Sequence, residues 1–175
     1  MFMDYHRRSV RLKQYDYSNH GYYFITICTQ NRINVFGEIE NNQMIINKNG
    51  LILKIWLLNL INRFGIIIDE YQIMPNHIHF IIKIVGANHD SPKKNDELNI
   101  RAIRESPLHQ RSMLSKIIGY LKMNVSKEIG LKIWQRNYYE RIIRNEKEYL
   151  KIKEYIKLNP KMWGRDRNNL NKTPL

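Results

Sequence analysis

Hydrophobic and polar positions along this chain follow two different periods, and each period marks a set of segments. Four segments are short and rich in aromatic and β-branched residues, which is typical of β-strands. They are residues 22–29, 66–74, 77–84 and 138–143. Pro75 and Asn76 are turn-forming residues, so they predict a tight hairpin between the second and third strands. Residues 38–48 predict a further short hairpin or strand, with turns around Asn41 and Asn42.

Three other segments carry apolar residues at helical spacing, and they predict helices. They are residues 51–64, residues 112–129 and a segment that follows Asn145 and runs to about Leu158. Gly65 is the expected C-cap of the first helix, and Asn145 with Glu148 is the expected N-cap pair of the third. The order strand, helix, two strands, helix, strand, helix predicts an α+β fold, in which an antiparallel sheet has its helices packed on one face.

The chain divides by composition into one domain with two flanking segments. Residues 1–20 form a basic N-terminal arm, residues 21–163 form the folded domain, and residues 164–175 form a C-terminal tail. Residues 86–111 are polar and contain two prolines, which predicts a long loop inserted into the domain. Such long loops in compact domains are often functional or disordered.

The composition and charge narrow the class of partner. Apolar residues make up 43% of the 175 residues, which is enough for a folded core, and the formal net charge is +13. Such an excess of positive charge favours a polyanionic partner, most commonly nucleic acid. An anionic membrane surface is the rival, but no basic amphipathic helix, lipidation signal or membrane-length apolar run is present. The N-terminus is too polar for a signal peptide, so we expect a cytoplasmic protein without a membrane partner.

The sharpest chemical feature is the tripeptide His77-Ile78-His79. Alternate residues of a strand point to the same face, so the two imidazoles would lie together and could bind one divalent metal. Two histidines that only form hydrogen bonds would give the same pattern. Cys28 is the single cysteine, so neither an internal disulfide nor a cysteine-based zinc site is expected.

The third predicted helix offers two further candidates for the same site. Tyr155 and Asn159 are four residues apart and therefore share a helix face. Asn159 could give an amide oxygen to an octahedral cation, while Tyr155 acts as the nucleophile. Tyr155 lies at the edge of the apolar stripe formed by Tyr149, Ile152 and Ile156, which suits a residue that must reach a site. A core tyrosine and a helix-end asparagine remain the alternative.

Three stretches of the sequence resemble one family of enzymes. They are YDYSNHGYYFITICTQNR (residues 15–32), MPNHIHF (residues 74–80) and WQRNYYERIIRNEKEYLKIKEYIKLNPKMW (residues 134–163). Together they resemble the single-tyrosine HUH transposase family, and most closely its REP-associated tyrosine transposase branch. In that family a Tyr-x-x-x-Asn or Tyr-x-x-x-Gln arrangement carries the nucleophile, and Tyr155 with Asn159 stands there in this chain.

The resemblance implies both a fold and an activity. It implies a ferredoxin-like sandwich, with Mg²⁺ or Mn²⁺ held by His77, His79 and Asn159. It also implies that residues 21–163 form the catalytic domain, which cleaves and rejoins single-stranded DNA near hairpins through a 5′-phosphotyrosine intermediate at Tyr155. Family members act as monomers or as homodimers. Tyr139 is the tyrosine to test as a substitute nucleophile.

Two other hypotheses remain open at this stage. A ferredoxin-like module could bind single-stranded DNA or RNA without cutting it, through aromatic side chains exposed on the sheet. A metal-dependent oxygenase also uses His-x-His, but it usually needs a carboxylate ligand as well. Several basic and aromatic residues are candidates for nucleic-acid contacts. They are Arg136, Arg141, Arg144, Lys151, Lys157, Tyr22, Tyr23, Trp134 and Tyr138.

Overall fold

The computed structural model describes residues 21–85 and 112–170. The predicted basic arm at residues 1–20 and the predicted insertion at residues 86–111 lie outside the described residues, and so do residues 171–175. The elements are β1 (Gly21–Cys28), η1 (Gln30–Arg32), β2 (Gly37–Glu40), β3 (Gln43–Ile46), α1 (Lys48–Phe64), β4 (Ile67–Met74), β5 (His77–Ile84), α2 (Met113–Ile129), β6 (Tyr139–Ile143), α3 (Glu146–Leu158) and η2 (Pro160–Arg165).

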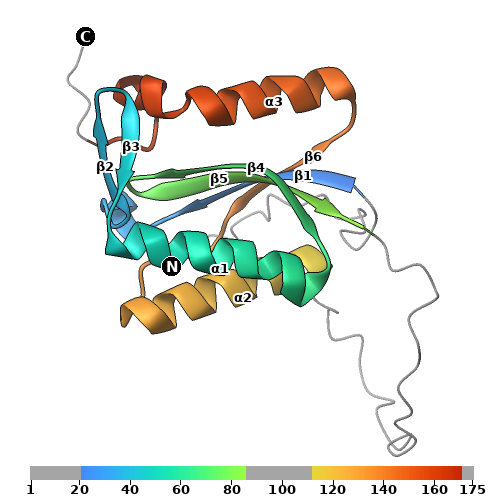
Figure 1. Ribbon diagram of the computed structural model, residues 1–175, viewed down its shortest axis with the longest axis horizontal. Helices are drawn as coiled ribbons and strands as arrows, with labels where there is room; N and C mark the ends of the chain where they lie inside the picture. Colours follow the sequence, from blue (N-terminus) through green and yellow to red (C-terminus); the bar gives the residue numbers. More distant parts are fainter. Residues whose placement is uncertain (1–20, 86–111, 171–175) are drawn as a thin grey trace, which may run out of the picture.

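The main sheet has four strands in the order β4-β5-β1-β6, and every neighbouring pair is antiparallel. Strands β2 and β3 form a separate two-stranded hairpin, as residues 38–48 predict. Helices α1 and α2 lie side by side on one face of the main sheet (Figure 1). The predicted α+β class, with an antiparallel sheet and helices packed on it, is confirmed.

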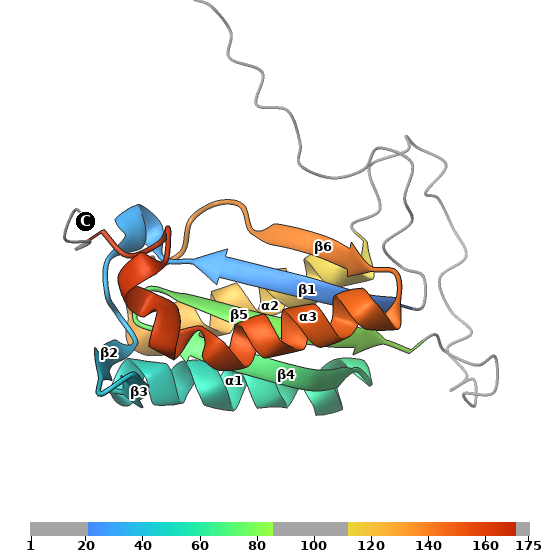
Figure 2. The same cartoon turned by 90° about the horizontal axis from the view of Figure 1, so that it is seen from above.

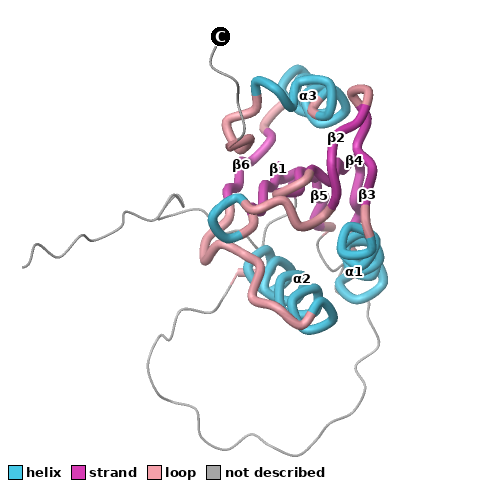
Figure 3. The backbone as a smooth tube through the Cα atoms, turned by 90° about the vertical axis from the view of Figure 1, so that its left-hand side faces the viewer, coloured by secondary structure: helices cyan, strands magenta, loops and turns pink. Residues whose placement is uncertain are grey.

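The expectation that all helices share one face needs a correction, because α3 lies on the opposite face of the sheet (Figure 3). The reason lies in the central strand β5, in which all residues but Lys83 are buried. Ile78, Phe80 and Ile82 join the large core under α1 and α2, whereas Ile81 joins a second cluster with Ile156 of α3. A strand that is apolar on both faces needs cover on both sides.

The helix ends agree with the predictions, whereas α1 begins three residues earlier than predicted, at Lys48. Asn47 caps α1 by accepting a hydrogen bond from the Gly50 amide, and Gly65 ends the helix in the left-handed conformation (φ 61°). In α2, the apolar residues that recur at helical spacing are buried: Leu114, Ile117, Ile118, Leu121 and Val125. In α1, the buried face includes Leu53 and Leu57, whereas Ile55 is 54% exposed. Within residues 21–85 and 112–170, no helix is long and apolar enough to cross a membrane.

Candidate functional site

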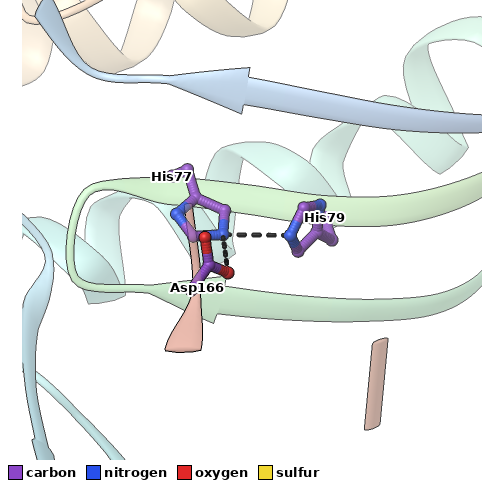
Figure 4. A group of neighbouring side chains, drawn as sticks. All are labelled: His77, His79 and Asp166. Atoms are coloured by element: carbon purple, nitrogen blue, oxygen red, sulfur yellow. Dashed lines mark hydrogen bonds and ion pairs between the residues drawn. The ribbon is translucent and has the colours of Figure 1, made fainter. Parts of the chain in front are cut away.

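Two histidines of β5 meet on the face of the sheet that α3 covers. His77 and His79 are two residues apart on the strand, and their Nε2 atoms lie 3.0 Å from each other (Figure 4). Both side chains are buried, with exposed fractions of 0% and 2%. The neighbouring strand β1 supplies Phe24, whose ring stacks on His79 at 5.4 Å between centroids. The two imidazoles are therefore held together in a site that excludes most water.

A hydrogen-bond network fixes the proton on the His77 ring. The Asn76 amide nitrogen donates to two backbone carbonyl oxygens, of Arg32 (2.9 Å) and Asn168 (2.8 Å). Carbonyl oxygens only accept, so this orientation of the Asn76 amide is determined and its Oδ1 atom must be an acceptor. His77 Nδ1 lies 2.8 Å from that Oδ1 and therefore carries the proton. The lone pair of the neutral ring is then on Nε2, which faces His79.

His79 has a comparable partner on β1. The Thr26 hydroxyl oxygen lies 2.8 Å from His79 Nδ1, and both residues are buried. A hydroxyl can accept from Nδ1–H, which would leave the Nε2 lone pair of His79 free as well. Partners that orient the second ring nitrogen are typical of metal-binding histidines. Asn76 and Thr26 are thus positioned to present both Nε2 atoms to one ion.

The segment that follows η2 brings a carboxylate to the same place. Asp166 Oδ2 lies 3.8 Å from His77 Nε2, and the Asp166 side chain is only 5% exposed. Its other oxygen accepts from the Asn168 amide at 2.6 Å, which closes a short turn. The turn is anchored on its far side by Arg32, whose guanidinium donates to the Arg167 carbonyl oxygen at 3.1 Å. Residues 166–168 of the predicted tail therefore lie against the histidine pair.

His77, His79 and Asp166 together form a group that could hold a metal ion, since their ligand atoms all lie within 4.8 Å of one another. Burial lowers the pKa of His77 to about 4, although the nearby Asp166 carboxylate opposes this shift. Burial and the neighbouring His77 lower the pKa of His79 well below its ordinary value. Both rings are therefore neutral at neutral pH, which is the form that binds a metal.

Tyr155 of α3 reaches the histidine pair from the opposite side of the site. Its hydroxyl lies 3.3 Å from His79 Nε2, and its ring packs edge-on against Phe24. Burial raises the pKa of the Tyr155 hydroxyl, and the Asp166 charge raises it further, whereas a side-chain hydrogen bond with Asn159 lowers it. The residue as a whole is 47% exposed, so a substrate can approach this hydroxyl.

Asn159 is placed at the end of α3, one turn after Tyr155, and is 1% exposed. Its side-chain oxygen is buried and has no hydrogen-bond partner among the described residues. A buried amide oxygen without a partner is costly, and a bound ion is one of the partners that can satisfy such an oxygen. The donor set of two imidazoles, one carboxylate and one amide oxygen fits a divalent cation.

A β-bulge in β4 determines how α3 docks on the sheet. The pairing of β4 with β5 shifts between Ile68 and Glu70, so Asp69 is the extra residue. In regular pairing, Asp69 and Glu70 would point to opposite faces, but a bulge re-aims a side chain. Asp69 accepts from Lys153 Nζ at 3.1 Å, and Glu70 pairs with Lys157 Nζ at 3.4 Å.

These two ion pairs bracket Tyr155 on α3, because Lys153 and Lys157 lie two residues before and after it. Tyr149, one turn before Lys153, also donates its hydroxyl to Asp69, at 2.6 Å. Only Ile156 of α3 is fully buried, so apolar contact alone ties this helix weakly to the sheet. The polar contacts to β4 therefore set the position of Tyr155 along the sheet. The Tyr149 hydroxyl is therefore bonded to Asp69 and not to the histidines.

The structure brings together three of the four residues that the sequence singled out: His77, His79 and Tyr155. Asn159 is the fourth, and it is buried beside Tyr155. Asp166 was missed, because it lies in an irregular segment to which no hydrophobic period applies. A compositional signal was present, since Asp166 is the sole acidic residue after Glu154 in the sequence.

Comparison with other proteins places the chain in a family and identifies its fold. A protein of Haemophilus influenzae that is described as uncharacterized is 43% identical over 168 residues, which cover 92% of each chain. No family model matches the sequence. A solved structure of a REP-associated tyrosine transposase, bound to a REP hairpin, superimposes with a TM-score of 0.57 at 21% identity, over 84% of this chain and 70% of that one. The chain therefore belongs to the family of the Haemophilus influenzae protein and has the fold of a REP-associated tyrosine transposase.

Proposed function

We propose that this chain is a metal-dependent enzyme that cleaves and rejoins single-stranded DNA near hairpins, with Tyr155 as the nucleophile. The observation that carries the proposal is the approach of the Tyr155 hydroxyl to within 3.3 Å of His79 Nε2, the atom that faces His77 and lies near Asp166. A nucleophile beside a cluster of metal-ligand atoms is the arrangement that a tyrosine transposase requires. The shared fold supports this assignment.

His77, His79 and Asp166 would hold Mg²⁺ or Mn²⁺, and the buried Asn159 oxygen is a further ligand candidate. Such a cation, when bound, polarises a phosphate oxygen and offsets the charge that develops on the phosphoryl group. The carboxylate of Asp166 makes a hard oxygen-ligating cation a better occupant than two imidazoles alone would. Asn76 and Thr26 would act as positioning residues by orienting the two rings.

Tyr155 would form the covalent link to the substrate. Its hydroxyl oxygen attacks the phosphorus of a DNA phosphodiester as its proton leaves to solvent, so an O–P bond to tyrosine forms. The bond from phosphorus to the 3′ oxygen breaks, and that oxygen leaves as a 3′-hydroxyl after taking up a proton. The phosphotyrosine retains a phosphodiester bond, so a second 3′-hydroxyl can reverse the step and join a new strand.

The raised pKa of the Tyr155 hydroxyl is the main obstacle to this chemistry, since the neutral hydroxyl is a weak nucleophile. Two features of the site oppose it. The Asn159 side chain forms a hydrogen bond that favours the tyrosinate, and positive charge beside Asp166 would cancel the effect of that carboxylate. We therefore expect cleavage to require the metal and to rise with pH.

The partner that we propose is single-stranded DNA that carries a hairpin. The transposase with the same fold was solved with a REP hairpin bound, and the net charge of +13 on this chain favours a nucleic acid. A test uses labelled single-stranded DNA from the regions that flank this chain's gene, incubated with Mn²⁺ or Mg²⁺ and separated on a denaturing gel. We expect a covalent protein–DNA band that depends on the metal.

Variants identify the residues responsible. Tyr155→Phe and His77→Ala should each abolish the band, while Tyr139→Phe should leave it intact. Tyr139 is a matched control, because its ring also contacts Phe24 (6.2 Å between centroids) but belongs to β6. A band that persists in Tyr155→Phe would assign the nucleophile elsewhere. Tight binding without a band on any flanking sequence would instead favour a module that binds nucleic acid without cutting it.

A further inference from the structure

Two adjoining hollows lie on the surface near the end of the sheet that carries the histidine pair. The first, of about 650 Å³, lies between the C-terminal half of α2 and the segment that follows it. The second, of about 500 Å³, lies between η1 and residues 135–137. Gln135 and Arg136 line both hollows, so the two hollows adjoin each other. We call this surface the basic trough.

Every charged side chain that the described part of the chain places in the basic trough is positive. Five cationic side chains line it: Arg32, Lys122, Lys127, Lys132 and Arg136. No aspartate or glutamate among residues 21–85 and 112–170 lines either hollow. The carboxylate next to Lys127 in sequence, Glu128, accepts a hydrogen bond from Trp56 of α1 instead. A surface with five cations and no carboxylate favours a phosphate backbone.

The floor of the trough is held in place by hydrogen bonds. The Lys122 ammonium donates to the backbone oxygens of Gln135 (2.6 Å) and Arg136 (3.1 Å), which leaves its third N–H for a ligand. The Trp134 indole donates to the Lys122 carbonyl oxygen at 3.1 Å, and its ring packs on Phe36. The exposed side chains of Met123 and Leu131 add apolar surface to the same hollow. Cations beside apolar surface suit nucleotides better than they suit small anions.

The second hollow adds groups that can recognise bases. The side-chain amides of Gln30, Asn31, Gln135 and Asn137 line it together with two arginines. An amide presents a donor and an acceptor side by side, which matches the edges of unpaired bases. Asn31 and Arg32 both have φ of 54°, in the left-handed region that non-glycine residues rarely adopt. Backbone strain of this kind persists at functional sites, where surrounding contacts enforce it.

The turn that contains these strained residues connects the trough to the candidate active site. Backbone hydrogen bonds join Gln30 to Ile133 and Gln135 to Cys28, the residue that pairs with His77 in the sheet. On its other side, Arg32 donates to the carbonyl oxygen of Arg167, next to Asp166. Figure 2 shows η1 and the end of η2 at the same end of the sheet. A strand bound in the trough would therefore lead toward the histidine pair.

We propose that the basic trough binds the single-stranded segment of the substrate outside the cleaved phosphate. The cations of the first hollow hold its phosphates, and the amides of the second hollow contact an unpaired base next to the active site. The link to cleavage rests on the proposed function above. Binding of single-stranded DNA by this surface is independent of the proposed function, because the trough shares none of the residues that would hold the metal or act as nucleophile.

The test measures binding and cleavage separately. Binding of labelled single-stranded DNA to the full chain carrying Tyr155→Phe is followed by fluorescence anisotropy in EDTA over a range of salt concentrations. The variant that combines Lys132→Ala with Arg136→Ala removes two exposed cations of the trough. The matched control combines Lys48→Ala with Lys147→Ala, which removes the same charge from two exposed positions on α1 and α3. Unlabelled duplex of the same sequence serves as competitor.

We expect the trough variant to bind about tenfold more weakly at low salt, with a salt slope reduced by about 1.4 for two lost phosphate contacts. The control should change affinity by less than about twofold. Equal losses in both variants would overturn the proposal, and so would duplex that competes as well as single strand does. The same two trough substitutions are also made in the protein that retains Tyr155. If that protein binds and cleaves DNA like wild type, the trough assignment fails while the proposed function stands. If the trough substitutions weaken binding but wild type cleaves no DNA, the proposed function fails while the trough assignment stands.

Discussion

Lowering the pH from 7.5 to 5 should destabilise the metal-free protein through His77. The ring is 0% exposed, and its pKa falls from 6.5 to about 4 on burial. In this pH window the unfolded chain takes up a proton at His77 and the folded chain does not, so stability falls as the pH falls. The full difference corresponds to about 3.4 kcal/mol, of which about 2 kcal/mol is lost by pH 5. His79 should add to the loss, since its pKa is lowered in the same direction.

Urea unfolding in EDTA, followed by tryptophan fluorescence at several pH values, measures this loss. The comparison is with His77→Asn, which keeps a polar side chain but cannot ionise. Other groups titrate in both proteins, so the difference between the two pH profiles isolates the imidazole. We expect the variant to lose about 2 kcal/mol less stability than wild type between pH 7.5 and 5. If the unfolding free energies of wild type and variant fall equally with pH, His77 is not held as a buried neutral ring, and its Nε2 lone pair is not free to bind a metal.

Four further substitutions test other parts of the geometry. Thr26→Val keeps the side-chain shape but removes the partner of His79 Nδ1, so Mn²⁺ affinity measured by calorimetry should fall about 10- to 100-fold; an unchanged affinity would contradict this role. Asp69→Asn weakens the contacts of residue 69 with Tyr149 and Lys153, so amide hydrogen exchange should accelerate in α3 but not in α2. If the exchange rates of the α3 amides stay as in wild type, Asp69 has no role in docking α3. Gly37→Ala should lower the unfolding free energy by more than about 1 kcal/mol, because the φ of Gly37 is +140° and a Cβ there would collide with a backbone oxygen. Gly119 lies in an open position on α2, so Gly119→Ala should raise the unfolding free energy by up to about 1 kcal/mol. Urea unfolding of both variants measures these opposite changes.

The secondary structure was predictable because its signals are local. The α2 stripe from Leu114 to Val125 is buried as its spacing predicts. The Asn145–Glu148 pair also forms as expected, since Asn145 Oδ1 accepts from the Glu148 amide and Glu148 accepts from the Arg144 amide. Such caps depend on residues three or four positions apart, and a sequence displays them directly.

The features that were missed depend on contacts between distant segments. A helical period shows that α3 has an apolar face, but it does not show which face of the sheet receives it. The bulge at Asp69 changes one pairing step between β4 and β5, and two adjacent acidic residues give no warning of it. Asp166 reaches the histidines only because the turn at residues 166–168 is anchored to Asn76 and Arg32, 90 or more residues earlier in the chain.

The position of Asp166 and Asn168 in the chain has a consequence for the time at which the site becomes complete. Both residues follow every strand and helix of the described domain. Domains can begin to fold during synthesis, and the sheet with its helices can assemble before these two residues leave the ribosome. Until then the histidine pair lacks its carboxylate, and the Asn76 amide lacks one of the two carbonyl oxygens that orient it. The group of His77, His79 and Asp166 therefore becomes complete only after every strand and helix of the described domain has been synthesised.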